Sequence, residues 1–156
     1  MRGDVIIVEE HHRSAAEAIA PTLLTAIAAA GGKYTITVAG ESGSGKSETA
    51  TAIAEVLEEA GIYSVILQQD DYFVYPPKSN DAARRKDISW VGTQEVKIDL
   101  LSEHMKAFLD GADVMQKPLV DYATDSVGEE AFAFGDAQVA IAEGTYTSLV
   151  KNVNTR

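Results

Sequence analysis

The stretch Gly-Glu-Ser-Gly-Ser-Gly-Lys-Ser at residues 40–47 constrains the fold more than any other part of the sequence. It fits the pattern G-x-x-x-x-G-K-[ST] of the P-loop, which cradles phosphates between a strand and a helix. Its glycines can adopt positive φ and leave no Cβ between the backbone N–H groups and a bound anion. Residues 33–39 alternate as a strand does, and the apolar residues within 50–60 have helical spacing. The sequence therefore predicts a strand, a phosphate-binding loop and a helix, which together bind a nucleotide.

Several residue types in this loop have a chemical task in phosphate binding. Lys46 supplies a mobile positive charge for the β- and γ-phosphates, and the hydroxyl of Ser47 is a ligand for Mg²⁺. The positive end of the following helix points at the same phosphate oxygens. The predicted nucleotide-binding residues are Gly40, Glu41, Ser42, Gly43, Ser44, Gly45, Lys46, Ser47 and Glu48.

Composition and charge narrow the class of protein further. The chain has 156 residues, the size of one domain, and its formal net charge of −11 argues against nucleic acid or an anionic membrane as a partner. It contains no cysteine, which excludes disulfides, zinc–thiolate sites and a cysteine nucleophile. The N-terminus lacks the pattern of a signal peptide, and no window approaches the length of an apolar membrane span. We therefore expect a cytoplasmic protein.

The first 32 residues are expected to form an arm and a helix. Residues 4–9 predict a short strand or an apolar arm that packs on the body of the protein. Residues 14–17 form a capping box that starts an alanine-rich helix, with a kink or a fresh start near Pro21. The adjacent His11 and His12 suggest a metal site, but no third ligand lies at a suitable spacing, and we favour a solvated pair.

Two acidic strand ends are candidates for the chemistry. Residues 62–67 predict a strand that leads to Asp70 and Asp71, and the apolar run 137–142 predicts a buried parallel strand that leads to Glu143. In open α/β sheets, ligands gather at the carboxyl ends of the strands. An aspartate there can orient or deprotonate an attacking hydroxyl or hold Mg²⁺, and Glu143 matches the Walker B position. The alternatives are an acidic turn at Asp70 and a strand-capping role for Glu143.

The connection at residues 74–92 offers candidates for which two interpretations remain open. It is expected to be a long polar loop without regular structure, which makes it either functional or disordered. Its basic residues Arg84 and Arg85 either attract the acceptor or belong to a solvated charge run. Trp90 either forms a wall of a substrate pocket or packs in the core.

The segments between residues 93 and 146 complete the pattern. Residues 93–110 predict a helix in which His104 is exposed, and two short strands near 114–120 and 131–134 suggest a β-ribbon over the site. Asp121 and Tyr122 in this ribbon either face a ligand or form a turn. A further helix is expected to begin at Thr145.

Together these residues resemble the uridine kinase and phosphoribulokinase family of P-loop kinases, from about residue 33 to the C-terminus. The resemblance is carried by the P-loop, by Gln69-Asp70 with aromatic residues behind it, by the helix from Thr93, and by residues 118–122 and 143–146. It implies that Lys46 and Ser47 bind phosphate and Mg²⁺, that Asp70 activates the acceptor hydroxyl, and that Glu143 helps to hold the metal. It also places three residues near the acceptor: Tyr72, Asp121 and Tyr122.

The sequence departs from the pattern of this family in two places and in length. Residues 88–92 stand where uridine kinases carry a Phe-Asp-His-Pro-like stretch, and no histidine follows His104 to contact a pyrimidine. A different nucleoside, a sugar phosphate or a vitamin-like alcohol is therefore an alternative acceptor. Family members continue with an arginine-bearing lid and two more strands, so we expect a fragment or a natural truncation in which the edge of the P-loop strand is covered by the N-terminal strand or left unpaired.

We therefore predict a single three-layer α/β domain over residues 1–156, with an N-terminal arm and helix at 1–32 and a nucleotide-binding core at 33–156. The sheet is mainly parallel, with strands near 34–39, 62–68 and 137–142. The predicted function is ATP-dependent transfer of the γ-phosphoryl group, with Mg²⁺, to a hydroxyl of a small molecule. An ATP-hydrolysing switch and a non-catalytic nucleotide-binding fragment are the alternatives, and the sequence leaves the oligomeric state open.

Overall fold

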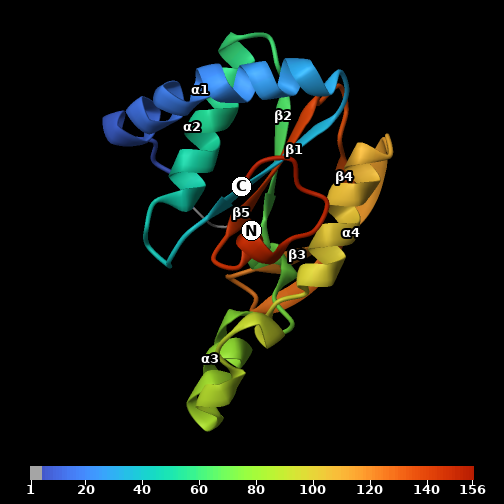
Figure 1. Cartoon of the computed structure of the whole chain (residues 1–156). Coiled ribbons are helices and arrows are strands. Elements are labelled where there is room, and N and C mark those ends of the chain that lie inside the picture. The colour runs from blue at the N-terminus through green and yellow to red at the C-terminus, as the bar shows by residue number, and fades with distance from the viewer. Residues whose placement is uncertain (1–4) are drawn as a thin grey trace.

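Three parallel strands form the centre of the structure, a computed structural model that describes residues 5–156 (Figure 1). They are β1 (Tyr34–Ala39), β5 (Val139–Gly144) and β2 (Ser64–Gln68), in the order β1-β5-β2. Every residue of β5 is buried, as its apolar sequence predicts for a central parallel strand.

Helices cover both faces of this sheet. Successive side chains of a strand point to opposite sides, so the apolar strand β5 needs a packing partner on each face. On one face, α1 (Glu10–Ala30) and α2 (Lys46–Glu59) share a hydrophobic cluster with Val139 and Ile141 of β5. On the other face, α4 (Ile98–Leu109) shares a second cluster with Ala140 and Ala142. The predicted three-layer α/β fold is confirmed.

Helix α1 begins earlier than predicted and continues through Pro21. The backbone N–H of Glu9 donates to Nδ1 of His12 at 3.1 Å, so the helix begins at Glu10 and the expected cap at residues 14–17 is wrong. Residues 5–9 form no strand, and of the two alternatives the arm is found, because Val8 packs against the core. Residue 4 lies outside the described residues. None of the helices within residues 5–156 is both long and apolar enough to cross a membrane.

The connection between β2 and α4 contains more regular structure than predicted. It consists of η1 (Gln69–Tyr72), α3 (Pro77–Lys86), η2 (Ile88–Trp90) and η3 (Thr93–Glu95), where η marks a short 3₁₀ helix. Pro77 suits the start of α3, where a backbone N–H has no helical partner. The expected loop without regular structure is therefore wrong, and α4 begins at Ile98 rather than at Thr93.

A two-stranded antiparallel ribbon, β3 (Val114–Asp121) and β4 (Ser126–Ala133), confirms the predicted insertion. A buried ion pair fixes it to the end of β2: Nζ of Lys117 lies 2.7 Å from Oδ2 of Asp71. The backbone N–H of Val120 donates to Oδ1 of the same carboxylate at 3.0 Å. Asp71 is thus a structural residue that holds the ribbon beside the sheet.

The end of the chain returns to β1. After β5 comes only a short 3₁₀ helix, η4 (Thr147–Leu149), so the longer helix expected from Thr145 is not formed. Thr155 then forms a parallel β-bridge with Ile36. Its carbonyl accepts the N–H of Thr37, and its own N–H donates to the carbonyl of Thr35. The outer edge of β1, which we expected to be unpaired or covered by the N-terminal segment, is bonded by the C-terminal segment.

Candidate functional site

The register of the sheet brings the three predicted site segments to one edge. Val38 of β1 and Gln68 of β2 both pair with Glu143 of β5. The P-loop begins two residues after Val38, and Asp70 lies two residues after Gln68. The carboxyl group of Glu143 therefore belongs to the strand that separates the P-loop from Asp70.

The P-loop has the backbone conformation that its glycines predict. Gly43 and Gly45 have φ of 76° and 78°, and Gly45 is the N-cap of α2. A Cβ on Gly40 would stand 2.6 Å from Oγ of Ser44, so this position also favours glycine. Lys46 is the first residue of α2 and Ser47 the second, which places both at the positive end of the helix dipole.

Three oxygen-bearing side chains at this edge fit Mg²⁺. Ser47 lies in the first turn of α2, Asp70 in η1 and Glu143 near the end of β5. Glu143 is 3% exposed, although a carboxylate is costly to bury. Hydroxyl and carboxylate oxygens are the ligands that Mg²⁺ prefers, so the donor set present matches this ion.

A small cavity of about 90 Å³ opens beside Asp70. It is lined by residues from η1, α3 and β3 and their flanking turns: Asp70, Phe73, Pro77, Asn80, Arg84, Val120 and Tyr122. The structure thus brings together three residues that the sequence singled out, namely Asp70, Arg84 and Tyr122.

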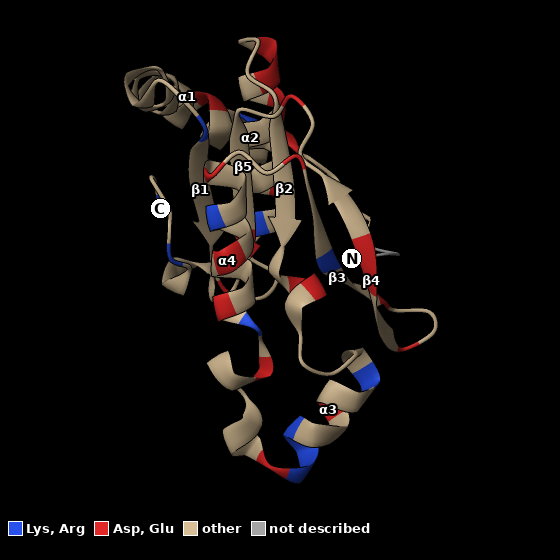
Figure 2. Cartoon of the chain, turned by 90° about the vertical axis from the view of Figure 1, so that its right-hand side faces the viewer, with Lys and Arg blue, Asp and Glu red and all other residues tan. Residues whose placement is uncertain are grey.

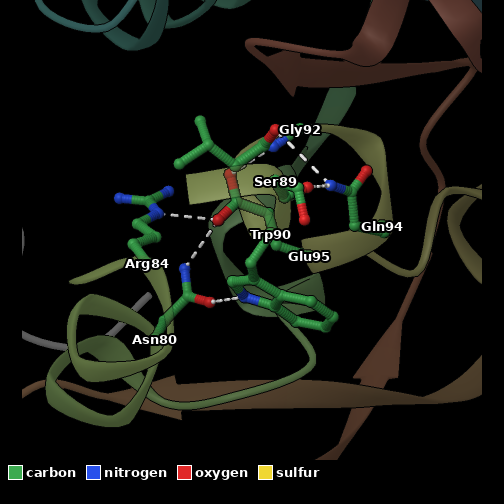
Figure 3. A network of polar contacts seen from close by, with 8 residues as sticks. Asn80, Arg84, Ser89, Trp90, Gly92, Gln94 and Glu95 are labelled. Carbon is green, nitrogen blue, oxygen red and sulfur yellow. Dashed lines mark hydrogen bonds and ion pairs between the residues drawn. The ribbon is translucent and has the colours of Figure 1, made fainter. Parts of the chain in front are cut away.

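The buried carboxylate of Glu95, which lies outside the cavity, holds two residues of the cavity wall in place (Figure 3). Oε2 of Glu95 accepts bonds from Nε of Arg84 at 2.7 Å and from Nδ2 of Asn80 at 3.0 Å. Burial acts to raise the pKa of Glu95, but the hydrogen bonds from Arg84 and Asn80 outweigh it and hold the pKa below its ordinary value. The hydrogen bond that Arg84 donates to Glu95 raises the pKa of Arg84. Both cavity residues are therefore held in one orientation by Glu95.

Trp90 supports this wall without lining the cavity. Its Nε1 donates to Oδ1 of Asn80 at 2.7 Å (Figure 3). Its ring lies 5.3 Å from that of Tyr75. Trp90 is therefore neither a wall of the cavity nor a core residue. Its side chain is half-buried and contacts the cavity residue Asn80 from behind.

The remaining candidates for the acceptor pocket lie elsewhere in the structure. Tyr72 is fully buried in the core, where its hydroxyl is 2.8 Å from Nδ1 of His104, and burial raises its pKa. His104 is therefore buried, and the prediction that it is exposed is wrong. Arg85 is exposed and pairs with Asp81, and Asp121 accepts the backbone N–H groups of the turn that follows it.

Basic residues gather on α3 in this acidic chain. Lys78, Arg84, Arg85 and Lys86 all belong to this one helix, and Figure 2 shows their blue segments at its two ends. Positive charge beside the cavity favours an acceptor or a phosphate that carries negative charge.

Sequence reasoning missed Asn80 and Glu95 as parts of this wall. Glu95 follows Gly92 by three residues, and its Oε1 accepts the Gly92 N–H at 3.4 Å, which is the spacing of a capping box. That spacing was the available signal for Glu95. For Asn80 the sequence carries no comparable signal.

Comparisons with known proteins agree with this architecture. A sequence profile of the Phosphoribulokinase / Uridine kinase family matches residues 35–156. The chain is 28% identical over 124 residues to the bifunctional alpha-galactosidase/sucrose kinase AgaSK of Mediterraneibacter gnavus, covering 73% of this chain. A possible uridine kinase from Bacillus stearothermophilus superposes with a TM-score of 0.60 at 20% identity over 73% of the chain. D-glycerate 3-kinase from Cryptococcus neoformans superposes with a TM-score of 0.60 at 17% identity over 83%.

The share of each relative that is matched differs widely. The chain spans 13% of AgaSK, 61% of the possible uridine kinase and 51% of the glycerate kinase chain. The two structural likenesses support the fold, and the profile match extends over more than half of the sequence. On that match, the chain belongs to the Phosphoribulokinase / Uridine kinase family.

Proposed function

We propose that the chain carries the phosphotransfer site of a small-molecule kinase, which moves the γ-phosphoryl group of ATP to an acceptor hydroxyl. The observation that carries this proposal is the pairing of both Val38 and Gln68 with Glu143. It supports a site in which the buried Glu143 lies between the phosphate-binding loop on one side and a second acid, Asp70, on the other. Phosphoryl transfer requires mainly positioning and charge neutralisation, and these residues supply both.

Each residue has a defined task in this proposal. The P-loop backbone and Lys46 hold the phosphates, and Asp70 accepts the proton of the acceptor hydroxyl as it attacks the γ-phosphorus. The bond from the γ-phosphorus to the β–γ bridging oxygen breaks, and ADP leaves with its electron pair. Ser47 and Glu143 would hold Mg²⁺, directly or through water, with Asp70 at the same edge of the sheet. The ion, when bound, neutralises the charge that develops on the phosphate oxygens.

The acceptor is proposed to be a small sugar, sugar acid or sugar phosphate rather than uridine. A cavity of about 90 Å³ has room for a few water molecules or for the hydroxyl-bearing end of a small compound. The polar residues Asn80 and Arg84 line it, together with the exposed Tyr122. The sucrose kinase and glycerate kinase names of two relatives agree with such an acceptor.

Two substitutions test the phosphotransfer site. Lys46→Ala is expected to abolish activity, because the phosphates lose their mobile positive charge. Asp70→Asn should lower kcat by about a hundred-fold or more while the affinity for ATP, measured by calorimetry, stays within about three-fold. Full turnover by Asp70→Asn would show that Asp70 is not the base.

An acceptor screen separates this proposal from its rivals. Purified protein is incubated with ATP and Mg²⁺ and with sugars, sugar acids, sugar phosphates, nucleosides or pantothenate-like alcohols, and ADP formation is followed. ADP formation that depends on one acceptor class supports a kinase. We propose the cytoplasm, where ATP is abundant, as its location. Equal phosphate release without any acceptor would indicate an ATPase switch, and binding without turnover a nucleotide-binding fragment.

A further inference from the structure

Helix α1 brings a histidine to the P-loop from about 30 residues earlier in the sequence. A hollow of about 410 Å³ lies between them, with Gly43, Gly45 and Glu48 on one side and His11 and His12 on the other. The imidazole of His12 is in close contact with the loop, because a Cβ built on Gly45 would stand 2.7 Å from its Nε2. The absence of a Cβ on Gly45 leaves room for this close approach.

The hydrogen bond that caps α1 also decides which nitrogen of His12 carries a proton. Nδ1 accepts the backbone N–H of Glu9 at 3.1 Å. A ring nitrogen that accepts a hydrogen bond carries no hydrogen, so the proton of the neutral ring is on Nε2. Nε2 is the atom that faces Gly45. His12 therefore presents an N–H donor beside the backbone N–H groups of the P-loop.

The direction of a bound nucleotide follows from the two cavities. The γ-phosphate has to face the cavity at Asp70, which is bordered by α3. Figure 1 shows α3 and α1 at opposite ends of the molecule, with the loop that precedes α2 between them. A triphosphate whose γ end points toward Asp70 directs its α-phosphate and ribose away from it, toward the hollow in front of His12.

We propose that His12 donates a hydrogen bond from Nε2 to the α-phosphate of the bound nucleotide, and that the hollow beside it receives the ribose. This inference rests on the proposed function of the P-loop as a nucleotide site. It assigns a task to the N-terminal helix, which precedes the part of the chain matched by the family profile. Glu9 and Glu48 also line this hollow and repel phosphate, and a donor at His12 partly offsets that repulsion.

Imidazole nitrogen NMR tests the contact directly. Ligand atoms of Glu9, His11 and His12 lie within 4.8 Å of one another and could hold a metal ion, contrary to the expectation that the two histidines have no third ligand. The protein is therefore titrated with ADP in EDTA, so that no such metal contributes to the result. The Nε2 resonance of His12 should shift with a saturation curve that matches the calorimetric Kd. His104, which is buried against Tyr72, is the internal control and should not move. ADP binding without any response from His12 would overturn the inference, whereas absence of ADP binding to the wild-type protein would overturn the proposed function itself.

Matched variants separate the donor from the helix cap. His12→Gln and His12→Glu both keep a side-chain acceptor for the Glu9 N–H, so α1 should remain intact by circular dichroism. Gln retains a donor and should keep the Kd for ADP within about three-fold, whereas Glu has none and should weaken binding by about ten-fold or more. Ser14→Ala, exposed on the same helix, should bind ADP as the wild type does. Equal affinity of the His12→Glu variant and the wild type would contradict the proposed hydrogen bond.

Discussion

Gly144 packs directly against Gln69 because it has no side chain, and this contact joins the two acidic segments of the site. Its φ is 154°, and a Cβ at this position would stand 2.3 Å from Cβ of Gln69. Gln69 is almost fully buried, and its Oε1 accepts the backbone N–H of Tyr146 at 2.6 Å. Because Glu143 and Asp70 directly adjoin these two residues in sequence, the contact fixes their relative position.

Substitution of Gly144 should therefore be costly. Gly144→Ala combines a backbone conformation that disfavours L side chains with a severe overlap, so we expect the free energy of unfolding to fall by about 2–4 kcal/mol. Urea denaturation measures the change. Gly128→Ala is the matched control, because no atom lies within 4 Å of a Cβ there and its φ is not positive; it should change stability by less than about 0.5 kcal/mol. Similar values for the two variants would show that the Gly144–Gln69 contact does not hold in solution.

At the residue scale, the sequence predicted the site best where a functional motif consists of consecutive residues. The P-loop is eight consecutive residues, and its glycine conformations follow from that pattern alone. Tyr72 and His104 are 32 positions apart, and only the packed fold shows that they bond to each other instead of facing solvent or substrate. Asp70 and Asp71 are adjacent in sequence, yet Lys117 distinguishes the structural acid from the one that lines the cavity.

Helix α3 is an element held by polar contacts rather than by apolar burial. Asn80 is its one buried residue, so the sequence has no apolar stripe that predicts a helix packed on a core. Asn80 and Arg84 lie four residues apart, on one face of the helix, and both donate to Glu95. By contrast, the ribbon β3–β4 was predicted from two short apolar segments around a polar loop, which needs no knowledge of its partners.

This mode of attachment predicts a pH dependence for the element. In the folded protein the pKa of Glu95 lies below its ordinary value of 4.5, so its ionised form stabilises the fold above about that pH. The contribution is lost as the pH falls from there through the folded-state pKa. We expect the difference in unfolding free energy between wild type and Glu95→Gln to be largest near neutral pH and to shrink in acid.

Chemical denaturation of both proteins between about pH 3 and pH 7 measures that difference. Asp81→Asn is the control, because it breaks an exposed ion pair with Arg85 on the same helix and should change stability by less than about 0.5 kcal/mol throughout. A difference for Glu95→Gln that stays constant across the range would contradict the ionised network.

At the scale of the whole molecule, the order of the strands determines what has to be covered. The sequence patterns predicted three strands of a mainly parallel sheet, one of them buried, but they carry no information about the order of the strands. The structure places β5 in the middle and leaves β1 at one edge. Thr35 on that edge is bonded by Asn154: its backbone N–H and its hydroxyl donate to Oδ1 of Asn154 at 2.9 and 2.8 Å. These are contacts between residues more than 100 positions apart, which no local pattern predicts.

Loss of this cover should expose a strand edge. Asn154→Ala removes the side-chain acceptor of the Thr35 N–H and one of the two acceptors of its hydroxyl, the other being the carbonyl of Asn152. We therefore expect the free energy of unfolding to fall by about 1–3 kcal/mol and the C-terminal segment to detach from β1. An edge strand with unpaired backbone groups favours pairing between molecules, so light scattering should show more self-association than in the wild type. Lys151→Ala is the control in the same segment, because it breaks an exposed ion pair with Asp99 and should alter neither property. If the Asn154→Ala variant matches the wild type in both measurements, the C-terminal segment does not protect the edge of the sheet.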